Sequence, residues 1–328
     1  MGEVAIELAL KFLAHDKFVR NDCYVVSVSG NAAASDTSIR EESEFLSWME
    51  ASRGVIDNSL LSTFSSLPES ETREVATYSC MSGGKRWRGL VALATAEIFG
   101  NTGAAVPVAC AVELAHAASL LLDDLPSMDD AATRRGRPCA HLVYSRASVD
   151  MAAVFMINLA YEVLLKNRLA KPENCISSAL ASARVANRML LGQEHDLTQL
   201  TGGTVSKKQA LEVARCKTGE LFGFAAEGAA IACGANELQI NAFYKAGIRL
   251  GIAYQIADDL ADRFGDPDAL GKPTGMDGEK QCVGNVLSEA EAREAVRRLR
   301  ESAVSKLAGF NSNSNRILQL IEHVKLPE

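Results

Sequence analysis

The sequence lacks an excess of basic charge and the segments typical of membrane or secreted proteins. Its formal net charge is −7, which argues against nucleic acid as the main partner, because binding to a phosphate backbone needs a basic surface. We find no apolar run of membrane-spanning length, and the early acids Glu3, Glu7 and Asp16 suit neither a signal peptide nor a transit peptide. We therefore expect a cytoplasmic protein with no transmembrane segment.

Cysteine pairs at metal-binding spacing are also missing. The eight cysteines are scattered, with no Cys-x-x-Cys motif and no Cys/His cluster at zinc spacing. Most lie among Ala, Val or Ile, which is typical of reduced thiols in a hydrophobic core.

Alternating β patterns are nearly absent, and helical periodicity takes their place. No proline occurs between Pro172 and Pro267, which leaves long helices uninterrupted. The 3.6-residue period predicts helices over residues 41–64, 105–122, 149–170, 175–197, 207–232, 237–262 and 289–310. Several are Ala-rich and apolar nearly all round, as expected of central helices in a large all-α bundle.

The first 38 residues differ from the rest. Residues 3–20 have the spacing of an amphipathic helix, and the small and polar residues at 27–38 predict a loop. We expect an N-terminal extension over 1–38 and one all-α domain over 39–328.

Acidic residues cluster where an apolar helix ends. The stretch LLLDDLPSMDDAATRRGRPCAH, residues 120–141, holds four aspartates and three arginines. Asp123 and Asp124 lie at the helix C-terminus, where the dipole favours cations and adjacent carboxylates repel. Either this is a solvated helix end, which is the better interpretation of the stretch alone, or the acids hold Mg²⁺, which binds carboxylates together with substrate phosphates.

A second acidic cluster changes that balance. In YQIADDLADRFGD, residues 254–266, another apolar helix ends in paired aspartates. Asp258 and Asp262 stand at i and i+4 on one face, with Asp259 beside them. Two such helix ends favour a shared multi-metal site.

Basic residues form separate clusters. SGGKRWRG, residues 82–89, has a glycine turn followed by Lys85, Arg86 and Arg88, without the spacing of a P-loop. Arg134 and Arg135 follow the first acidic cluster, and a guanidinium fork suits phosphate oxygens. Separate acids and bases imply an anionic substrate bridged by metal on one side and held by cations on the other, for which diphosphate is the natural candidate.

Six motifs in this order resemble the trans-isoprenyl diphosphate synthases, and most closely the bacterial geranylgeranyl diphosphate synthases of carotenoid pathways. They are GGKRWR, ELAHAASLLLDDLPSMDDAATRRGRPCAH, GQEHDL, CKTGELF, YQIADDLAD and LGKPTGMD, within residues 45–325. One motif would be weak, but six in register are specific. The resemblance implies an isoprenoid-synthase helical bundle with a large central cavity, usually a homodimer. It also implies head-to-tail condensation of isopentenyl diphosphate with an allylic diphosphate.

The resemblance also implies roles for individual residues. Those expected to bind Mg²⁺ are Asp123, Asp124, Asp129, Asp258, Asp259 and Asp262. Those resembling isopentenyl diphosphate anchors are Lys85, Arg88, His116 and Arg135, and those resembling allylic diphosphate contacts are Arg134 and Lys217. Thr218 and Gln255 would flank the developing cation, with Gln193 and Asp196 nearby. The catalytic set is Asp123, Asp124, Lys217, Thr218, Gln255 and Asp258. Without the family pattern, His116 would be an ordinary core histidine.

The chain departs from the family pattern at four positions. Met276 stands where a lysine normally helps to hold the allylic diphosphate. Gly89 replaces the usual proline, and Ala117 and Leu122 replace the common threonine and histidine. All six aspartates are kept, which favours an active enzyme.

Small residues precede the first acidic cluster. Ala118, Ser119 and Ala115 lie one and two turns before Asp123, along the wall of the expected tunnel for the growing chain. A bulky aromatic at position 118 would block the tail of a C15 product. Its absence predicts geranylgeranyl diphosphate (C20), with C25 as the next choice because small residues continue to Ala111.

Two alternatives remain open. A class I terpene cyclase also uses an Asp-rich helix and Mg²⁺, but would lack GGKR-x-R and would usually replace the second aspartate motif. A regulatory subunit of a heteromeric synthase would bind a catalytic partner, and Met276 is the one hint of it.

Overall fold

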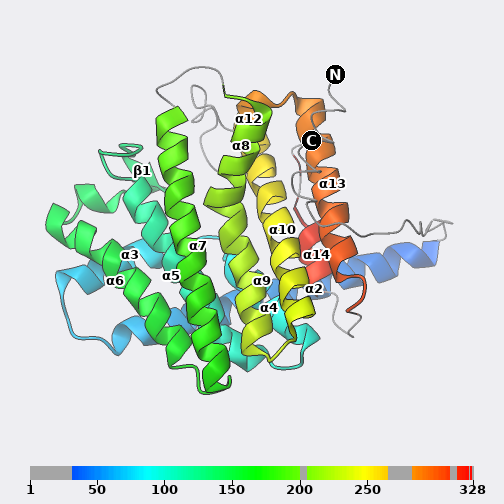
Figure 1. Ribbon diagram of the computed structural model, residues 1–328, viewed down its shortest axis with the longest axis horizontal. Coiled ribbons are helices and arrows are strands. Elements are labelled where there is room, and N and C mark those ends of the chain that lie inside the picture. The colour runs from blue at the N-terminus through cyan, green and yellow to red at the C-terminus, as the bar shows by residue number, and fades with distance from the viewer. Residues whose placement is uncertain (1–31, 200–204, 265–282, 311–315, 325, 327–328) are drawn as a thin grey trace.

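Twelve α-helices, a 3₁₀ turn, a π-helix and one small hairpin make up the described part of the fold (Figure 1). The structure is a computed structural model and describes residues 32–199, 205–264, 283–310, 316–324 and Leu326. The first elements are α2 (Ala32–Ser65), α3 (Glu71–Cys80), α4 (Trp87–Ile98), α5 (Thr102–Asp123), β1 (Thr133–Arg134), β2 (Arg137–Pro138) and a 3₁₀ turn, η1 (Ala140–Leu142). They are followed by α6 (Arg146–Leu165), α7 (Pro172–Gln199), α8 (Lys207–Ala214), a π-helix, η2 (Arg215–Gly219), and α9 (Glu220–Ala232). The last elements are α10 (Glu237–Phe264), α12 (Val283–Val286), α13 (Glu289–Leu307) and α14 (Arg316–Glu322).

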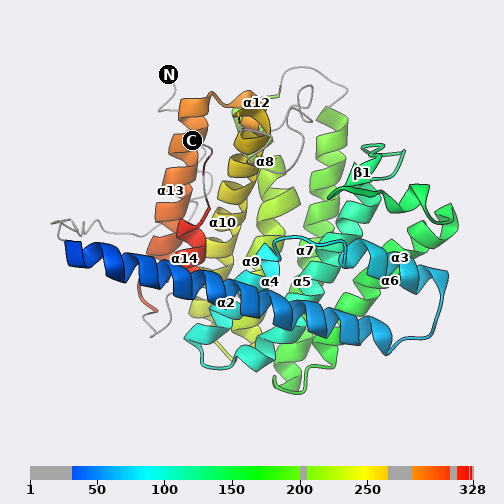
Figure 2. The same ribbon diagram turned by 180° about the vertical axis from the view of Figure 1, so that it is seen from behind.

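Helix α9 lies at the centre of the bundle. Every residue of it is buried, and it packs against α4, α5, α7 and α10. Helices α7, α8, α10 and α13 stand side by side in Figure 1, whereas α2 crosses the opposite face of the bundle in Figure 2. This arrangement follows from the sequence, because a helix that is apolar all round has to be covered on every side.

The backbones of α9 and α10 approach closely because glycines line their contact. A Cβ atom on Gly247 would lie 2.5 Å from the carbonyl oxygen of Phe222, and one on Gly251 would lie 2.8 Å from the Cα of Gly219. Any larger side chain would therefore push the helices apart. The contact also brings the C-terminal half of α10 beside η2.

The predicted fold class is confirmed, and so are most of the helices. The periodic segments correspond to α2, α5, α6, α7, the α8–η2–α9 run, α10 and α13. The prediction of a loop over 27–38 is wrong for its second half, because α2 begins at Ala32 and runs unbroken to Ser65. The predicted helix over 3–20 lies outside the described residues, and the domain boundaries remain a prediction.

The helical period did not predict every element. The prediction of one helix over 207–232 missed η2, because one residue inserted into a helical turn barely changes the apolar pattern. The short helices α3, α4 and α14 were also missed. Side-chain caps show where some helices start: Ser70 accepts a hydrogen bond from the backbone N–H of Arg73, and Ser288 and Glu291 form a capping box on α13.

Two helices correct the statement that no apolar run reaches membrane-spanning length. By length and composition, α5 and α6 would each suffice to cross a membrane. Helix α5 has 67% of its most apolar window buried inside the bundle, as a core helix does, and α6 has 44%. Core helices pass the same test as membrane spans, so this finding is weak evidence for a membrane segment.

The cysteines in the described part of the chain are free thiols, and four of them are buried. Burial raises the pKa of Cys80 and of Cys110 to about 12. Both therefore behave as small apolar core residues, as predicted.

Candidate active site

The first acidic cluster lies at the end of α5, as predicted. Asp123 is the last helical residue and Asp124 is the C-cap. Asp124 is buried and accepts hydrogen bonds from Nε of Arg134 at 2.7 and 2.9 Å. Burial raises the pKa of Asp123, against the opposing effect of the nearby Lys217 ammonium. The Asp123 carboxylate is therefore partly desolvated, and the neighbouring Asp124 carboxylate is neutralised by Arg134.

The second acidic cluster lies near the end of α10. Asp258 is exposed, whereas Asp259 and Asp262 are buried. The Oδ1 of Asp259 accepts a hydrogen bond from the Gln255 amide nitrogen at 2.6 Å. Asp258 and Asp259 line the same cavity as Asp123 of α5, while Asp262 lies one turn further toward the helix end.

The π-helix η2 places Lys217 and Thr218 between α7 and α10. Lys217 Nζ donates to Asp196 Oδ2 on α7 at 2.6 Å. The Thr218 hydroxyl donates to Gln255 Oε1 on α10 at 2.7 Å. Because Asp259 can only accept, the Gln255 amide nitrogen must point to it, and the amide oxygen must therefore receive the Thr218 proton. The lone pairs of Thr218 are left for the interior.

Helix α7 reaches η2 closely because it carries a glycine. A Cβ atom on Gly192 would collide with Cys216. Gln193, the next residue, is not among the residues that line the cavity described below. Asp196, one turn on, does line it. Of the two α7 residues that the sequence placed near the developing cation, Asp196 lines the cavity and Gln193 does not.

The glycine turn before α4 receives an arginine from the hairpin. Gly83 and Gly84 both have positive φ angles. A Cβ on Gly84 would lie 2.7 Å from the Arg135 guanidinium, which donates a hydrogen bond to the Gly83 carbonyl oxygen. The turn is thus shaped around Arg135, and it presents Lys85 next to it.

Arg86 is a structural residue rather than a surface cation. Its guanidinium is buried and donates to Asp57 Oδ1 at 2.7 Å and to the Cys80 carbonyl oxygen at 2.9 Å, and it pairs with Glu113 at 3.5 Å. The other oxygen of Glu113 accepts the Gly89 backbone N–H at 2.9 Å. A proline at 89 has no N–H to donate, so the Gly89 departure fits the Glu113 contact.

These groups surround a two-lobed cavity. The basic lobe, about 760 Å³, is lined by Lys85, Arg86, Trp87, Arg88, Glu113, His116, Arg135, Tyr254 and Asp258, together with residues of α2 and the C-terminal segment. The aspartate lobe, about 350 Å³, is lined by Asp123, Arg134, Asp196, Lys217, Thr218, Gln255, Asp258 and Asp259, with Ser119 and Leu120 of α5. The shared wall consists of Arg88, His116, Arg135, Tyr254 and Asp258.

Two groups on the shared wall have altered electrostatics. The Arg88 guanidinium lies 4.8 Å over the Phe222 ring, and its buried Nε has no hydrogen-bond partner in the described part of the chain. Such an orphaned donor is the kind of group that an anion satisfies. Burial, with the charges of Arg88 and Arg135, lowers the pKa of His116 well below its ordinary range. His116 is therefore a neutral imidazole at the cavity, not a satisfied core residue.

The structure leaves several predicted residues away from the cavity. Asp124, Asp129 and Asp262 are not among its lining residues. Ala118 and Ala115 are buried in the core below the aspartate lobe, 1% and 8% exposed, whereas Ser119 lines that lobe. In the part of the chain that is described, no three acids, histidines or cysteines converge tightly enough to hold a metal ion. Met276 lies outside the described residues.

Sequence reasoning missed the aromatic part of the wall. The Tyr254 ring contacts both Trp87 and Phe222, with centroids 5.3 and 5.4 Å apart. Trp87 also lines the basic lobe. Tyr254 begins the YQIADD motif that contains Asp258 and Asp259, so the sequence could have indicated it as a residue of the site. No signal in the sequence indicated the contact of His323 with Trp87.

The fold and the site define an all-helical enzyme class with acidic and basic groups around one two-lobed cavity. A sequence model of the polyprenyl synthetase family matches residues 69–316. The chain is 35% identical over 250 residues to geranylgeranyl pyrophosphate synthase 12, chloroplastic, of Arabidopsis thaliana, covering 74% of this chain and 69% of that one. It is 32% identical over 231 residues to a farnesyl diphosphate synthase of Geobacillus stearothermophilus, covering 68% and 77%.

Solved structures agree. A polyprenyl synthetase from Streptomyces coelicolor superposes with a TM-score of 0.75 at 27% identity, covering 84% of this chain and 98% of that one. An FPP/GFPP synthase from Zymomonas mobilis gives 0.74 at 28% identity, covering 86% and 99%. The chain therefore belongs to the polyprenyl synthetase family and is a trans-isoprenyl diphosphate synthase, a prenyltransferase. This confirms the resemblance to the trans-isoprenyl diphosphate synthases drawn from the six motifs and decides against a terpene cyclase. The closer resemblance to bacterial enzymes of carotenoid pathways stays a prediction.

We predict that His116 makes the free energy of unfolding fall as the pH drops below about 6.5. Its folded pKa is far below the ordinary 6.5, so in that range the unfolded chain binds more protons than the folded chain. The stabilisation is complete above the unfolded pKa and is lost as the pH falls toward the folded one. Urea denaturation of the wild type and of His116→Gln at several pH values checks this. Equal pH slopes for the two proteins would contradict it.

Proposed function

We propose that the chain condenses isopentenyl diphosphate with an allylic diphosphate head to tail, and that its main product is geranylgeranyl diphosphate. The observation that supports this best is the shared wall between the two lobes. Arg88, His116 and Arg135 line both lobes, so they lie where substrates bound in the two lobes would meet. Two diphosphates held on the two sides would bring their reacting carbons together, which supplies much of the rate by proximity.

The basic lobe suits the isopentenyl diphosphate. Lys85, Arg88 and Arg135 present cations to it, and the free Nε of Arg88 is an additional donor for phosphate oxygen. Neutral His116 would add a hydrogen bond without placing another positive charge beside two guanidinium groups. Hydrogen bonds to an ionised phosphate are charge-assisted and roughly twice as strong as those between neutral groups.

The aspartate lobe suits the allylic diphosphate and the cation that forms from it. Arg134 and Lys217 are cations that line this lobe and not the basic lobe. Thr218 donates its proton to Gln255, so its oxygen presents lone pairs to the lobe. Together with the Gln255 dipole it would stabilise positive charge on the allylic carbon as the diphosphate leaves.

Magnesium is proposed as the resident metal, and the donors present fit it. Asp123 on α5 and Asp258 and Asp259 on α10 line one lobe, and carboxylate oxygens are the ligands that Mg²⁺ takes together with phosphates. Because these carboxylates do not converge on one point in the described part of the chain, Asp123 would bind Mg²⁺ from α5, and Asp258 and Asp259 from α10, each together with substrate phosphate. Asp124, Asp129 and Asp262 are the remaining members of the predicted set. Bound Mg²⁺ would neutralise the leaving diphosphate.

Product length is argued from α5. Ala118 and Ala115 lie one and two turns from Asp123 and are buried. Small side chains at these positions leave room beside α5 for the growing prenyl chain. The two curated relatives described above are named for geranylgeranyl and farnesyl diphosphate. The absence of a bulky side chain at 118 favours the longer product.

A homodimer is proposed from the outer face of α6 and α7. Met151 and Val154 on α6, and Ile176, Leu180 and Leu191 on α7, are 53–67% exposed and recur at helical spacing. The two helices pack against each other, and we infer that these residues share one apolar surface, which we call the α6–α7 face. An exposed apolar surface of this kind is typical of a subunit interface.

The proposed location is the cytoplasm, supported by the reduced, buried cysteines. Plant relatives are named chloroplastic or mitochondrial. Organelle interiors are also compatible with free thiols, so fractionation of the native protein decides between these compartments.

We expect the purified protein with Mg²⁺, isopentenyl diphosphate and farnesyl diphosphate to form geranylgeranyl diphosphate as its main product. Chromatography of the dephosphorylated alcohols measures the chain length. Omission of Mg²⁺ and addition of EDTA are the controls. A C15 end product would refute the proposed tunnel, and no turnover with any allylic primer would point to the regulatory subunit.

We expect Ala118→Phe to shorten the product, because the ring would fill the space one turn before Asp123. Burying the ring also destabilises the protein, by about 1–3 kcal/mol. Ala109→Phe is the matched control, since Ala109 is equally buried on α5 but lies about 21 Å along the helix axis from Asp123. Unchanged product length in Ala118→Phe would place the end of the tunnel elsewhere.

We expect Leu180→Asp to convert a dimer to a monomer, because it puts a charge into the centre of the α6–α7 face. Light scattering should give twice the chain mass of 35.1 kDa for the wild type and a single chain mass for the variant. Leu238→Asp is the control, because Leu238 is 80% exposed on α10 outside this face. A monomeric wild type would refute the proposal.

A further inference from the structure

A fully buried carboxylate lies directly behind the active-site π-helix. Glu220 is the first residue of α9 and is 0% exposed. It is not among the residues that line either lobe in the described part of the chain. The function proposed above does not use it, and an ionised side chain at such a site is costly unless it is fully paired.

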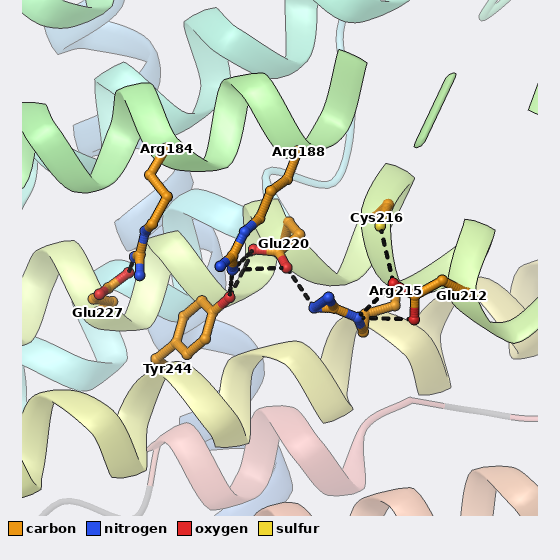
Figure 3. Close-up of polar contacts among 8 residues, drawn as sticks. All are labelled: Arg184, Arg188, Glu212, Arg215, Cys216, Glu220, Glu227 and Tyr244. Atoms are coloured by element: carbon orange, nitrogen blue, oxygen red, sulfur yellow. Dashed lines mark hydrogen bonds and ion pairs between the residues drawn. The ribbon is translucent and has the colours of Figure 1, made fainter. Parts of the chain in front are cut away.

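Three donors from three elements satisfy Glu220, as Figure 3 shows. Arg215 of η2 donates to Oε1 at 2.6 Å, and the Tyr244 hydroxyl of α10 donates to Oε2 at 2.7 Å. Arg188 of α7 bonds both oxygens at 3.2 and 3.3 Å and also the Tyr244 oxygen at 2.7 Å. We call Arg188, Arg215, Glu220 and Tyr244 the rear clamp.

The rear clamp and the active site hold the same π-helix from two sides. On the cavity side, Lys217 contacts Asp196 of α7 and Thr218 contacts Gln255 of α10. Behind, Glu220 and Arg215 contact Arg188 and Tyr244 of the same two helices. The rotation of η2 about its axis is therefore fixed jointly by both sets of contacts.

The clamp is sensitive to the chemistry of Glu220. An ionised carboxylate offers two acceptor oxygens and no donor, which matches three converging donors. Glutamine has almost the same shape, but its NH₂ group would face a guanidinium or the tyrosine hydroxyl. That mismatch would weaken the hold of the clamp on Arg215, which sits two residues before Lys217 and keeps its contacts with Glu212 at 3.1 and 3.2 Å.

We propose that Glu220 is a positioning residue for Lys217 and Thr218: its rear clamp sets the orientation of the π-helix that presents these two groups to the allylic diphosphate. This inference rests on the proposed function of the aspartate lobe. Glu220 acts through Arg215 and the backbone of η2, and it does not touch the substrate. Small displacements of positioning contacts are enough to slow a reaction considerably.

The chain provides a matched control. Glu227 lies two turns further along α9, is also buried, and pairs with Arg184 of α7. Figure 3 shows this pair apart from η2, beyond the Tyr244 ring. Glu227→Gln therefore makes the same chemical change on the same helix without touching Arg215, and its partner Arg184 meets the clamp only at the Tyr244 ring, 5.1 Å from the ring centroid.

The kinetic test compares Glu220→Gln and Glu227→Gln with the wild type. We expect Glu220→Gln to raise KM for the allylic diphosphate, or to lower kcat, by about tenfold, with KM for isopentenyl diphosphate unchanged. Glu227→Gln should leave both constants near the wild type. In a Lys217→Ala background, Glu220→Gln should have little further effect on the allylic KM. Equal changes in both KM values, or the same loss in both variants, would overturn the proposal.

A second measurement does not depend on activity. Amide hydrogen exchange of residues 215–219 should be faster in Glu220→Gln than in the wild type, and unchanged in Glu227→Gln. Unchanged exchange in Glu220→Gln would overturn the clamp even if the enzyme makes its product. Faster exchange in a protein without turnover would instead refute only the proposed function. If Glu220→Gln does not fold, Tyr244→Phe removes one donor and should give a smaller shift in the same direction, whereas no shift would overturn the proposal.

Discussion

The close backbone contact between α9 and α10 is the constraint on which the aspartate lobe depends. With glycines at 247 and 251, α10 lies directly against Phe222 and Gly219, and this spacing brings Gln255 within hydrogen-bond distance of Thr218. Gln255 in turn fixes Asp259. A wider separation would break the chain of contacts that links η2 to the second acidic cluster. The chemistry of the lobe is therefore built on a packing feature.

Ion pairs between different elements also fix the positions of the helices around the cavity. Three charges near the cavity have a close partner on another element: Arg86 meets Glu113, Arg134 meets Asp124, and Lys217 meets Asp196. Only the Arg86–Glu113 pair is buried on both sides, and breaking a buried pair leaves an uncompensated charge, which costs about 3–5 kcal/mol. These pairs restrict where α4, α5, α7 and the hairpin can lie. The remaining groups on the shared wall, with an orphaned Arg88 donor and a neutral His116, are the ones left to recognise an anion.

The sequence predicted well which side chains line the cavity, but it predicted poorly which residues hold those side chains in place. Asp123, Arg88 and Arg135 were expected around one anionic substrate because their types and clustering carry that chemistry, and all three line the cavity. The scaffold role of Arg86 could not be predicted, since its partners Asp57 and Glu113 are 29 and 27 residues away in the chain. Periodicity fixes a face of a helix, not which distant side chain meets it.

Helix α5 couples product length to stability. Asp123 belongs to the aspartate lobe, and the residues proposed to set the tail length lie on the turns before it, inside the core. Lys85, by contrast, is exposed on a turn and can change without disturbing packing. A larger side chain at 118 has to displace buried neighbours in an interior packed as densely as an organic crystal. Changes in product length therefore require compensating changes around α5, whereas changes in diphosphate binding at the turn do not.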